Sequence, residues 1–189
     1  MRTLVLTLIA PLFFVNFTGV IAEETMPNSV LDFKVDGIDG KPYALSQHKG
    51  EALLIVNVAS KCGRTPQYAG LEALYTKYHE KGLTVIGVPA NEFGGQEPGT
   101  NDEIKTFCTT KYKVTFPMMA KTVVKGKAIC PLYTYLITQG SKPAPIGWNF
   151  DKFLVDRNGK VVEHFDSKVT PEDPKLVGAI EKALADKAN

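Results

Sequence analysis

Two apolar runs separated by an amphipathic segment constrain the fold of this chain more than any other feature. Leu53 to Val58 (LLIVNV) and Leu83 to Val88 (LTVIGV) are rich in β-branched residues, which is typical of strands covered on both faces. Between them, apolar residues recur every three or four positions from Leu71 to Tyr78, and Gly82 ends the expected helix. The order strand, helix, strand predicts a right-handed parallel unit, with functional loops at the carboxyl ends of its strands.

The loop after the first strand brings Cys62 to the start of this helix. Thr65 is predicted to be the N-cap and Pro66 the first helical residue. The positive end of the helix favours a thiolate at Cys62, which is how thioredoxin-like folds use cysteine. Thioredoxins carry a second cysteine three residues on, but Thr65 stands there, so Cys62 cannot resolve its own oxidation locally. A structural free cysteine is the alternative interpretation.

The rest of the chain predicts further elements around this unit. A capping box at Thr100 to Glu103 starts one helix, and the turn Asp156 to Gly159 joins a second hairpin. The expected elements are an N-terminal hairpin (Leu31 to Val35 and Lys41 to Ala44), a helix from Thr100 to about Lys111, a strand from Met118 to Val124, a helix from Pro131 to Gln139, a hairpin from Asn149 to Phe165, and a helix from Glu172 to Asp186.

The N-terminus predicts export. Met1 and Arg2 precede a short apolar run, and small residues end it at Ala22, before two glutamates. We expect residues 1–22 to be a cleaved signal peptide and residues 23–189 to be one domain, periplasmic or secreted. An uncleaved anchor is the alternative. The net charge of +2 gives no electrostatic reason to expect nucleic acid as a partner.

Three cysteines are an odd number for an exported chain. Cys62 and Cys108 form either a static disulfide or a redox-cycling pair. Cys130, before Pro131, is interpreted as a small buried hydrophobe. The three histidines are scattered without ligand spacing, so no metal is expected.

Three separated segments together resemble one family: NVASKCGRTPQY from Asn57, NEFGGQEPG from Asn91, and WNFDKFLVDRNGKVV from Trp148. The chain resembles the glutathione peroxidase family from about Val30 to Leu184. The resemblance implies that family's α/β thioredoxin-like fold, a central mixed sheet flanked by helices, with an N-terminal β-hairpin. The family pattern PCNQF reads PANEF here, with Ala90 and Glu92 at the changed positions.

By this resemblance, Cys62 is the residue that attacks peroxide, and Gln96, Trp148 and Asn149 complete the catalytic tetrad. Their amides and indole are neutral hydrogen-bond donors suited to a thiolate or to peroxide oxygens. Cys108 resembles the resolving cysteine of the thioredoxin-dependent, non-selenium branch. A helix separates the two cysteines, so we expect their disulfide to require unwinding around Cys108.

The resemblance also sets the expected partners. A thiol co-substrate, either a thioredoxin-like dithiol or glutathione, would recycle the protein without a bound cofactor. The short segment between Leu136 and Trp148 lacks the insertion of tetrameric relatives, which implies a monomer and a site open to lipid hydroperoxides. The alternatives are an exported thioredoxin-fold metallochaperone, for which Cys62 alone provides one soft ligand, and a peroxide sensor that passes its disulfide to a client.

Overall fold

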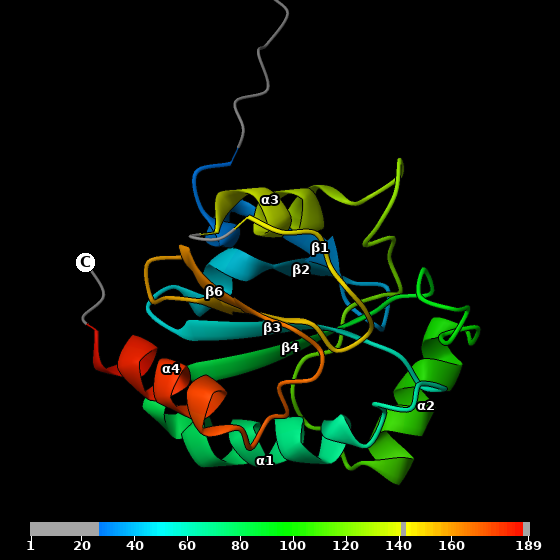
Figure 1. The fold of residues 1–189 in the computed structure, drawn as a ribbon. Coiled ribbons are helices and arrows are strands. Elements are labelled where there is room, and N and C mark those ends of the chain that lie inside the picture. Colours follow the sequence, from blue (N-terminus) through cyan, green and yellow to red (C-terminus); the bar gives the residue numbers. More distant parts are fainter. Residues whose placement is uncertain (1–26, 141–142, 187–189) are drawn as a thin grey trace, which may run out of the picture.

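In the computed structural model, which describes residues 27–140 and 143–186, a four-stranded sheet separates two layers. Figure 1 shows the sheet edge-on, with α3 and a hairpin on one face and α1 and α4 on the other. The predicted signal peptide lies outside the described residues. Among those residues, no helix combines the length and apolarity needed to cross a membrane.

The sheet has the order β4, β3, β5, β6, with β3 in its interior. Strand β3 (Ala52–Val58) pairs in parallel with β4 (Leu83–Pro89) and antiparallel with β5 (Lys152–Val155), which pairs antiparallel with β6 (Val161–Phe165). Every residue of β3 and β4 is buried. The predicted buried strands, the parallel unit and the second hairpin are therefore confirmed.

Alternating residues of β3 supply two separate cores, as a pleated strand requires. Leu54 and Val56 pack with α1 and α4 on one face, whereas Leu53 and Ile55 pack with α3 and the N-terminal hairpin on the other. The sheet is consequently fixed from both sides. Its loops project from a rigid support.

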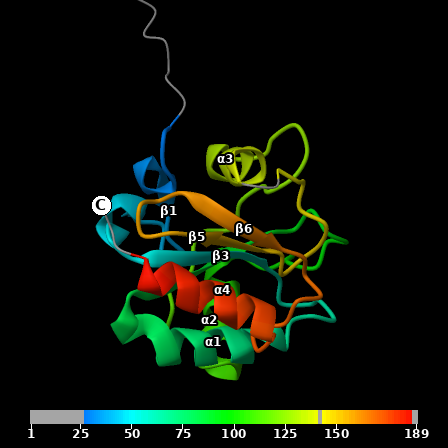
Figure 2. The same cartoon turned by 60° about the vertical axis from the view of Figure 1, so that its left-hand side comes forward.

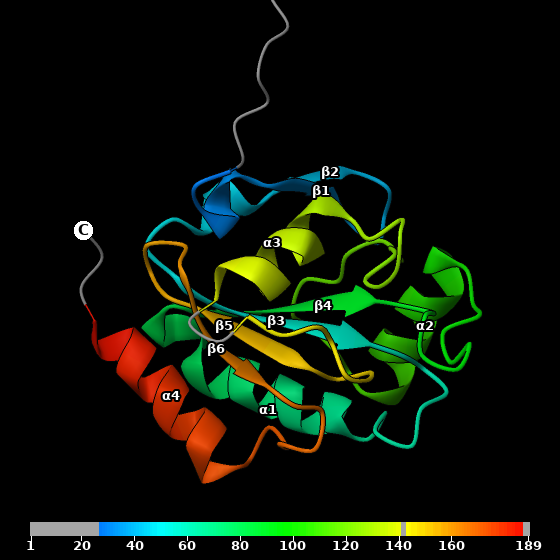
Figure 3. The same ribbon diagram turned by 45° about the horizontal axis from the view of Figure 1, so that its top comes forward.

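The helices follow the predicted order. Figures 2 and 3 show α3 on one face of the sheet, and Figure 3 shows α2 beyond the end at which β3 and β4 finish. Gly82, with a φ of 93°, ends the helical stretch after α1 as predicted. The helices are α1 (Gln67–Tyr78), continued by the 3-10 turn His79–Lys81, then α2 (Asn101–Lys111), α3 (Pro131–Gln139) and α4 (Pro174–Ala185).

The N-terminal hairpin is present but shorter than expected. Strands β1 (Lys34–Asp36) and β2 (Pro42–Ala44) pair antiparallel and are followed by a 3-10 turn, Leu45–His48. Leu31, expected in the first strand, lies instead in the 3-10 turn Val30–Asp32. A capping box between Ser29 and Asp32 stabilises that turn, and strand pairing therefore begins later.

The strand predicted from Met118 to Val124 is wrong as a regular element. The segment makes isolated bridges, from Met118 to Gly87 of β4 and from Met119 to Gly37 beside the hairpin. It connects the sheet to the hairpin instead of extending either one. Extended backbone without a continuous partner strand cannot form a ladder.

Candidate active site

The backbone around Cys62 is held by Thr65. The Thr65 hydroxyl accepts a hydrogen bond from the Cys62 amide at 2.9 Å and donates one to the Ala59 carbonyl at 2.8 Å. Thr65 was predicted to cap the helix, but its side chain binds this preceding turn, and α1 begins at Gln67. The prediction of an N-cap is therefore wrong, because the hydroxyl finds a closer local partner.

The sulfur of Cys62 lies in the turn that leads into α1. The Arg64 amide donates a hydrogen bond to it at 3.4 Å, and the side chain is 8% exposed. Backbone amides at a helix N-terminus stabilise negative charge. This environment suits a thiolate that a small reactant can still reach.

The loop after β4 carries Gln96 next to the Cys62 loop. Gly94 and Gly95 both have positive φ angles, 71° and 64°, which glycine adopts without strain. The Lys61 amide then donates to the Gln96 carbonyl at 3.0 Å. This hydrogen bond joins the two loops, and it places Gln96 opposite Lys61, the residue directly before Cys62.

Asn149 joins this pair from a distant part of the chain. Its side-chain amide donates to the Gln96 side-chain oxygen at 2.9 Å and faces the Phe93 carbonyl at 3.4 Å. Since Gln96 uses its oxygen as the acceptor, its NH₂ group remains a donor. The structure thus brings together Gln96 and Asn149, which the sequence comparison paired only by family resemblance.

The segment from Trp148 to Phe150 is fixed from behind by Asn57 of β3. The Asn57 side chain donates to the Trp148 carbonyl at 3.0 Å, and the Phe150 amide donates to the Asn57 carbonyl at 2.6 Å. Phe150 has a φ of 72°, an uncommon conformation for a residue with a side chain. Such strain is characteristic of functional segments, where the surrounding structure enforces it.

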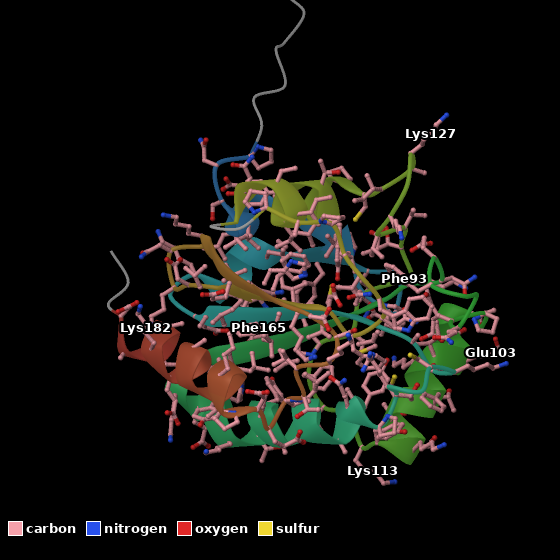
Figure 4. All side chains as sticks on the ribbon, viewed as in Figure 1. Phe93, Glu103, Lys113, Lys127, Phe165 and Lys182 are labelled. Atoms are coloured by element: carbon pink, nitrogen blue, oxygen red, sulfur yellow. The ribbon has the colours of Figure 1, made fainter. Side chains whose placement is uncertain are left out.

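Trp148 precedes Asn149 and is partly exposed. It is 40% exposed, and its ring packs against Phe93 with centroids 5.7 Å apart. The Lys125 ammonium lies 5.1 Å from the centre of the Phe93 ring. Figure 4 shows Phe93 on the same side of the molecule as Glu103 of α2, beyond the end of β4. Trp148 and Phe93 thus form an aromatic surface, with the Lys125 ammonium over the Phe93 ring.

Cys108 is buried on α2, in the same core cluster as Cys62. Both cysteines are free thiols in this structure. Burial raises the pKa of Cys108 to about 11, although the nearby Tyr68 hydroxyl opposes the shift. As a result, Cys108 is a protonated thiol at neutral pH. Cys130, half-buried, lies before α3 in the other core and away from this cluster.

The sequence did not point to two buried charged groups near the site. The Lys152 ammonium is fully buried and donates to Gln67, Phe150 and Val169 oxygens at 2.7–2.8 Å. Burial lowers its pKa to about 8. Glu97, beside Gln96, is also buried, and this raises the pKa of its carboxyl group. A charged residue within a motif gives no local indication of its burial.

The described residues, 27–140 and 143–186, contain no cluster of three or more potential metal ligands. Around Cys62, the structure shows a sulfur that accepts a hydrogen bond from the Arg64 amide, and a second thiol, Cys108, in the same buried cluster. Such an arrangement suits nucleophilic attack on an electrophilic oxygen or sulfur.

Comparison with known proteins places this geometry in a family context. A family model described as glutathione peroxidase matches residues 30–137. A hydroperoxy fatty acid reductase of Synechocystis sp. is 46% identical over 165 residues, covering 83% of this chain and 96% of that protein. The thioredoxin/glutathione peroxidase BtuE of Escherichia coli is 44% identical over 182 residues, covering 85% of this chain and all of that protein.

Solved structures agree with these matches. T. cruzi GPX1 has a TM-score of 0.67 and 39% identity, covering 85% of this chain and 99% of that one. A thioredoxin-family thiol:disulfide interchange protein from Chlorobium tepidum has a TM-score of 0.63 at 18% identity, covering 86% and 99%. The latter likeness concerns the fold alone. The expected thioredoxin-like α/β fold is confirmed.

Proposed function

The chain belongs to the glutathione peroxidase family, and we propose from this membership that Cys62 is the residue with which it attacks hydroperoxides. The protein is a thiol peroxidase, an oxidoreductase that takes electrons from thiols and passes them to a peroxide. The hydrogen bond between Asn149 and Gln96, beside the loop of Cys62, is the observation that carries the residue assignment.

In the first step, the Cys62 thiolate attacks the terminal oxygen of the peroxide. The O–O bond breaks, Cys62 becomes a sulfenic acid, and the leaving oxygen takes a proton to form water or an alcohol. The Gln96 NH₂ group and the indole N–H of Trp148 are neutral donors for the charge on sulfur and on the leaving oxygen. Hydrogen bonds to a charged group contribute about 1.5–3 kcal/mol each, more than the roughly 0.3–1 kcal/mol of a helix terminus.

In the second step, Cys108 condenses with the Cys62 sulfenic acid to form a disulfide and water. The last turn of α2 is weakly stabilised, since Thr109 and Thr110 are exposed and their hydroxyls bond back to carbonyls one turn earlier. β-Branched residues also have low helix propensity. This helix end can open and release Cys108 toward Cys62 at moderate cost.

The two-cysteine cycle supports a proposal for the reductant, and the surface around Trp148 supports one for the substrate. An intramolecular disulfide is a substrate for a thioredoxin-like dithiol, which we propose as the physiological reductant in place of glutathione. Exposed Trp148, with Phe93 and Lys125 beside it, offers an apolar surface and a cation to a fatty acid hydroperoxide. The similar Synechocystis protein is named for hydroperoxy fatty acids.

We propose further that the protein works as a monomer outside the cytoplasm, after removal of residues 1–22. The N-terminal sequence supports export, and the short chain between α3 and Trp148 supports the monomer. An exported thioredoxin-like protein would then supply the electrons. Mass spectrometry of the mature protein and its sedimentation in solution test these two statements.

The roles of the cysteines are tested by three variants in a peroxide assay with separate thioredoxin and glutathione recycling. We expect Cys62→Ser to abolish peroxide reduction. We expect Cys108→Ser to consume one equivalent of hydrogen peroxide and to lose turnover with thioredoxin. Cys130→Ser is the matched control and retains turnover. Normal thioredoxin-driven turnover in Cys108→Ser contradicts the two-cysteine cycle, and a single turnover in the wild type would favour a sensor.

A further inference from the structure

Glu97 is a buried carboxyl group whose oxygens lack a well-formed hydrogen bond, although Ser60 lies beside it as a donor. Its residue is 1% exposed, and neither side-chain oxygen accepts a well-formed hydrogen bond from the described residues. Its backbone is fixed, because the Glu97 amide donates to the Asn91 side chain at 2.8 Å. A buried polar group that lacks partners is costly, so one that the fold holds in place calls for a functional explanation.

Glu97 lines a hollow of about 410 Å³ between the Cys62 loop and α2. Ser60 and Lys61 form one wall, directly before Cys62. Ile104 and Phe107 form the other, and Cys108 follows Phe107 on the same helix. The carboxyl group therefore lies between the two segments that carry the proposed redox cysteines.

The charge of Glu97 acts on two groups that face it from the helices. Burial is the main cause that raises the pKa of the Cys108 thiol on α2 and of the Tyr68 hydroxyl on α1, and the charge of Glu97 adds to both shifts. Burial raises the pKa of Glu97 itself, while the adjacent Ser60 partly opposes this shift. The other charged groups around the hollow are Lys61, Lys121 and Glu103.

We propose that Glu97 is the proton acceptor for the Cys108 thiol during disulfide formation. As the S–H bond of Cys108 breaks, its proton passes to the Glu97 carboxylate and its sulfur attacks the sulfur of Cys62. The S–O bond of the sulfenic acid then breaks, and the departing hydroxide takes the proton from Glu97 to give water. The two electrons that reduce the sulfenic acid come from the Cys108 thiol, so the step needs no further reactant. The inference rests on the proposed role of Cys108.

A proton acceptor is needed because Cys108 ionises poorly while α2 is closed, and we propose that its proton leaves as the helix end begins to open. With a pKa of about 11, roughly one molecule in 10⁴ carries the thiolate at pH 7. The thiolate is the species that attacks sulfur. General base catalysis accelerates proton transfer by about 10²–10⁴, which matches this deficit.

The test is a single-turnover experiment without reductant, using Glu97→Gln, which keeps the shape and removes the base. Trp148 is the one tryptophan of the chain, and its fluorescence follows both steps after a stoichiometric addition of hydrogen peroxide. We expect sulfenic acid formation to keep its wild-type rate and disulfide formation at pH 7 to slow by about 100-fold or more. Glu80→Gln, which removes an exposed carboxylate after α1, is the control for loss of charge.

The pH dependence separates proton transfer from a structural effect. In Glu97→Gln, disulfide formation should speed up about tenfold per pH unit, toward the pKa of Cys108, while the wild-type rate stays level once Glu97 is ionised. In Glu97→Ala, added formate should enter the hollow and restore part of the rate. A wild-type rate of disulfide formation in Glu97→Gln overturns the proposal, as does a uniform slowing at every pH without formate rescue. Failure of the underlying two-cysteine cycle gives another result: if Cys108 is not the resolving residue, Cys108→Ser turns over normally with thioredoxin.

Discussion

Replacing Thr65 by valine tests whether one hydroxyl holds the reactive loop. Valine has almost the shape of threonine, but it can neither accept the hydrogen bond from the Cys62 amide nor donate to the Ala59 carbonyl. Thr65 is only 4% exposed, so water cannot readily replace the lost partners. The substitution therefore leaves a buried donor and a buried acceptor unsatisfied.

The expected loss of stability follows from these two groups. A buried polar group left without its partner costs about 1–3 kcal/mol, so the pair costs about 2–6 kcal/mol. Thr65→Ser keeps the hydroxyl and removes one methyl group, which costs about 1 kcal/mol. Against a total of roughly 5–15 kcal/mol for a domain of this kind, Thr65→Val should be clearly the less stable of the two.

Urea unfolding of the reduced proteins measures this difference. We expect both variants to keep the slope of the wild type, and the midpoint of Thr65→Val to fall well below that of Thr65→Ser. The rate of Cys62 with hydrogen peroxide should follow the same order, since a displacement of about 1 Å at a reacting atom can cost about 10²-fold in rate. If the two variants unfold within about 0.5 kcal/mol of each other, the Thr65 hydroxyl does not hold the loop.

Three further predictions address the buried lysine, the aromatic surface and the movable helix. Because the folded state lowers the pKa of Lys152 to about 8, the unfolded chain binds more protons between pH 8 and 10.5, and the free energy of unfolding should rise there by about 3 kcal/mol. Lys152→Met should lack this rise. If the variant and the wild type show the same dependence of unfolding free energy on pH, the lowered pKa of Lys152 is contradicted. Lys125→Ala should raise the KM for a fatty acid hydroperoxide several-fold more than that for hydrogen peroxide; equal changes would remove Lys125 from substrate recognition. Backbone amides around Cys108 should exchange faster in the oxidised protein, and equally slow exchange in both states counts against unwinding.

The elements that sequence predicted well are those whose pattern is local. Leu53 to Val58 is apolar at nearly every position, and the structure makes it the interior strand β3. The capping box of Thr100 and Glu103 marks the start of α2 because both its hydrogen bonds lie within one turn. Such features need no knowledge of the rest of the chain.

The residues that sequence missed depend on distant neighbours. Lys152 begins an apolar strand, and a lysine is usually exposed. Here its ammonium is buried, because Gln67 and Val169 supply oxygens that accept its hydrogen bonds. The burial of Glu97 depends on α2, whose residues Ile104 and Phe107 line the same hollow. The Met118 to Val124 segment failed for a related reason, since its extended backbone meets β4 and the hairpin at single bridges. Burial and pairing of this kind are properties of the tertiary structure.

The site itself required both sources of information. Family resemblance proposed Gln96 and Asn149, and the structure added the hydrogen bond that joins them. Neither residue type is distinctive alone, because loop amides are common on protein surfaces. What distinguishes them is that separate loops deliver both to the neighbourhood of Cys62.

The identity of residue 65 and the place of the second cysteine are physically connected. At this position a thiol would form weaker hydrogen bonds than the Thr65 hydroxyl and would leave the Cys62 amide and the Ala59 carbonyl poorly satisfied. The loop of Cys62 thereby gains rigidity and loses a local partner thiol. Cys108 lies instead on a helix end where Thr109 and Thr110 weaken the last turn, while its own burial favours the closed state. In the proposed cycle, the Cys62 sulfur is thus held in place, and the motion we expect is confined to the last turn of α2.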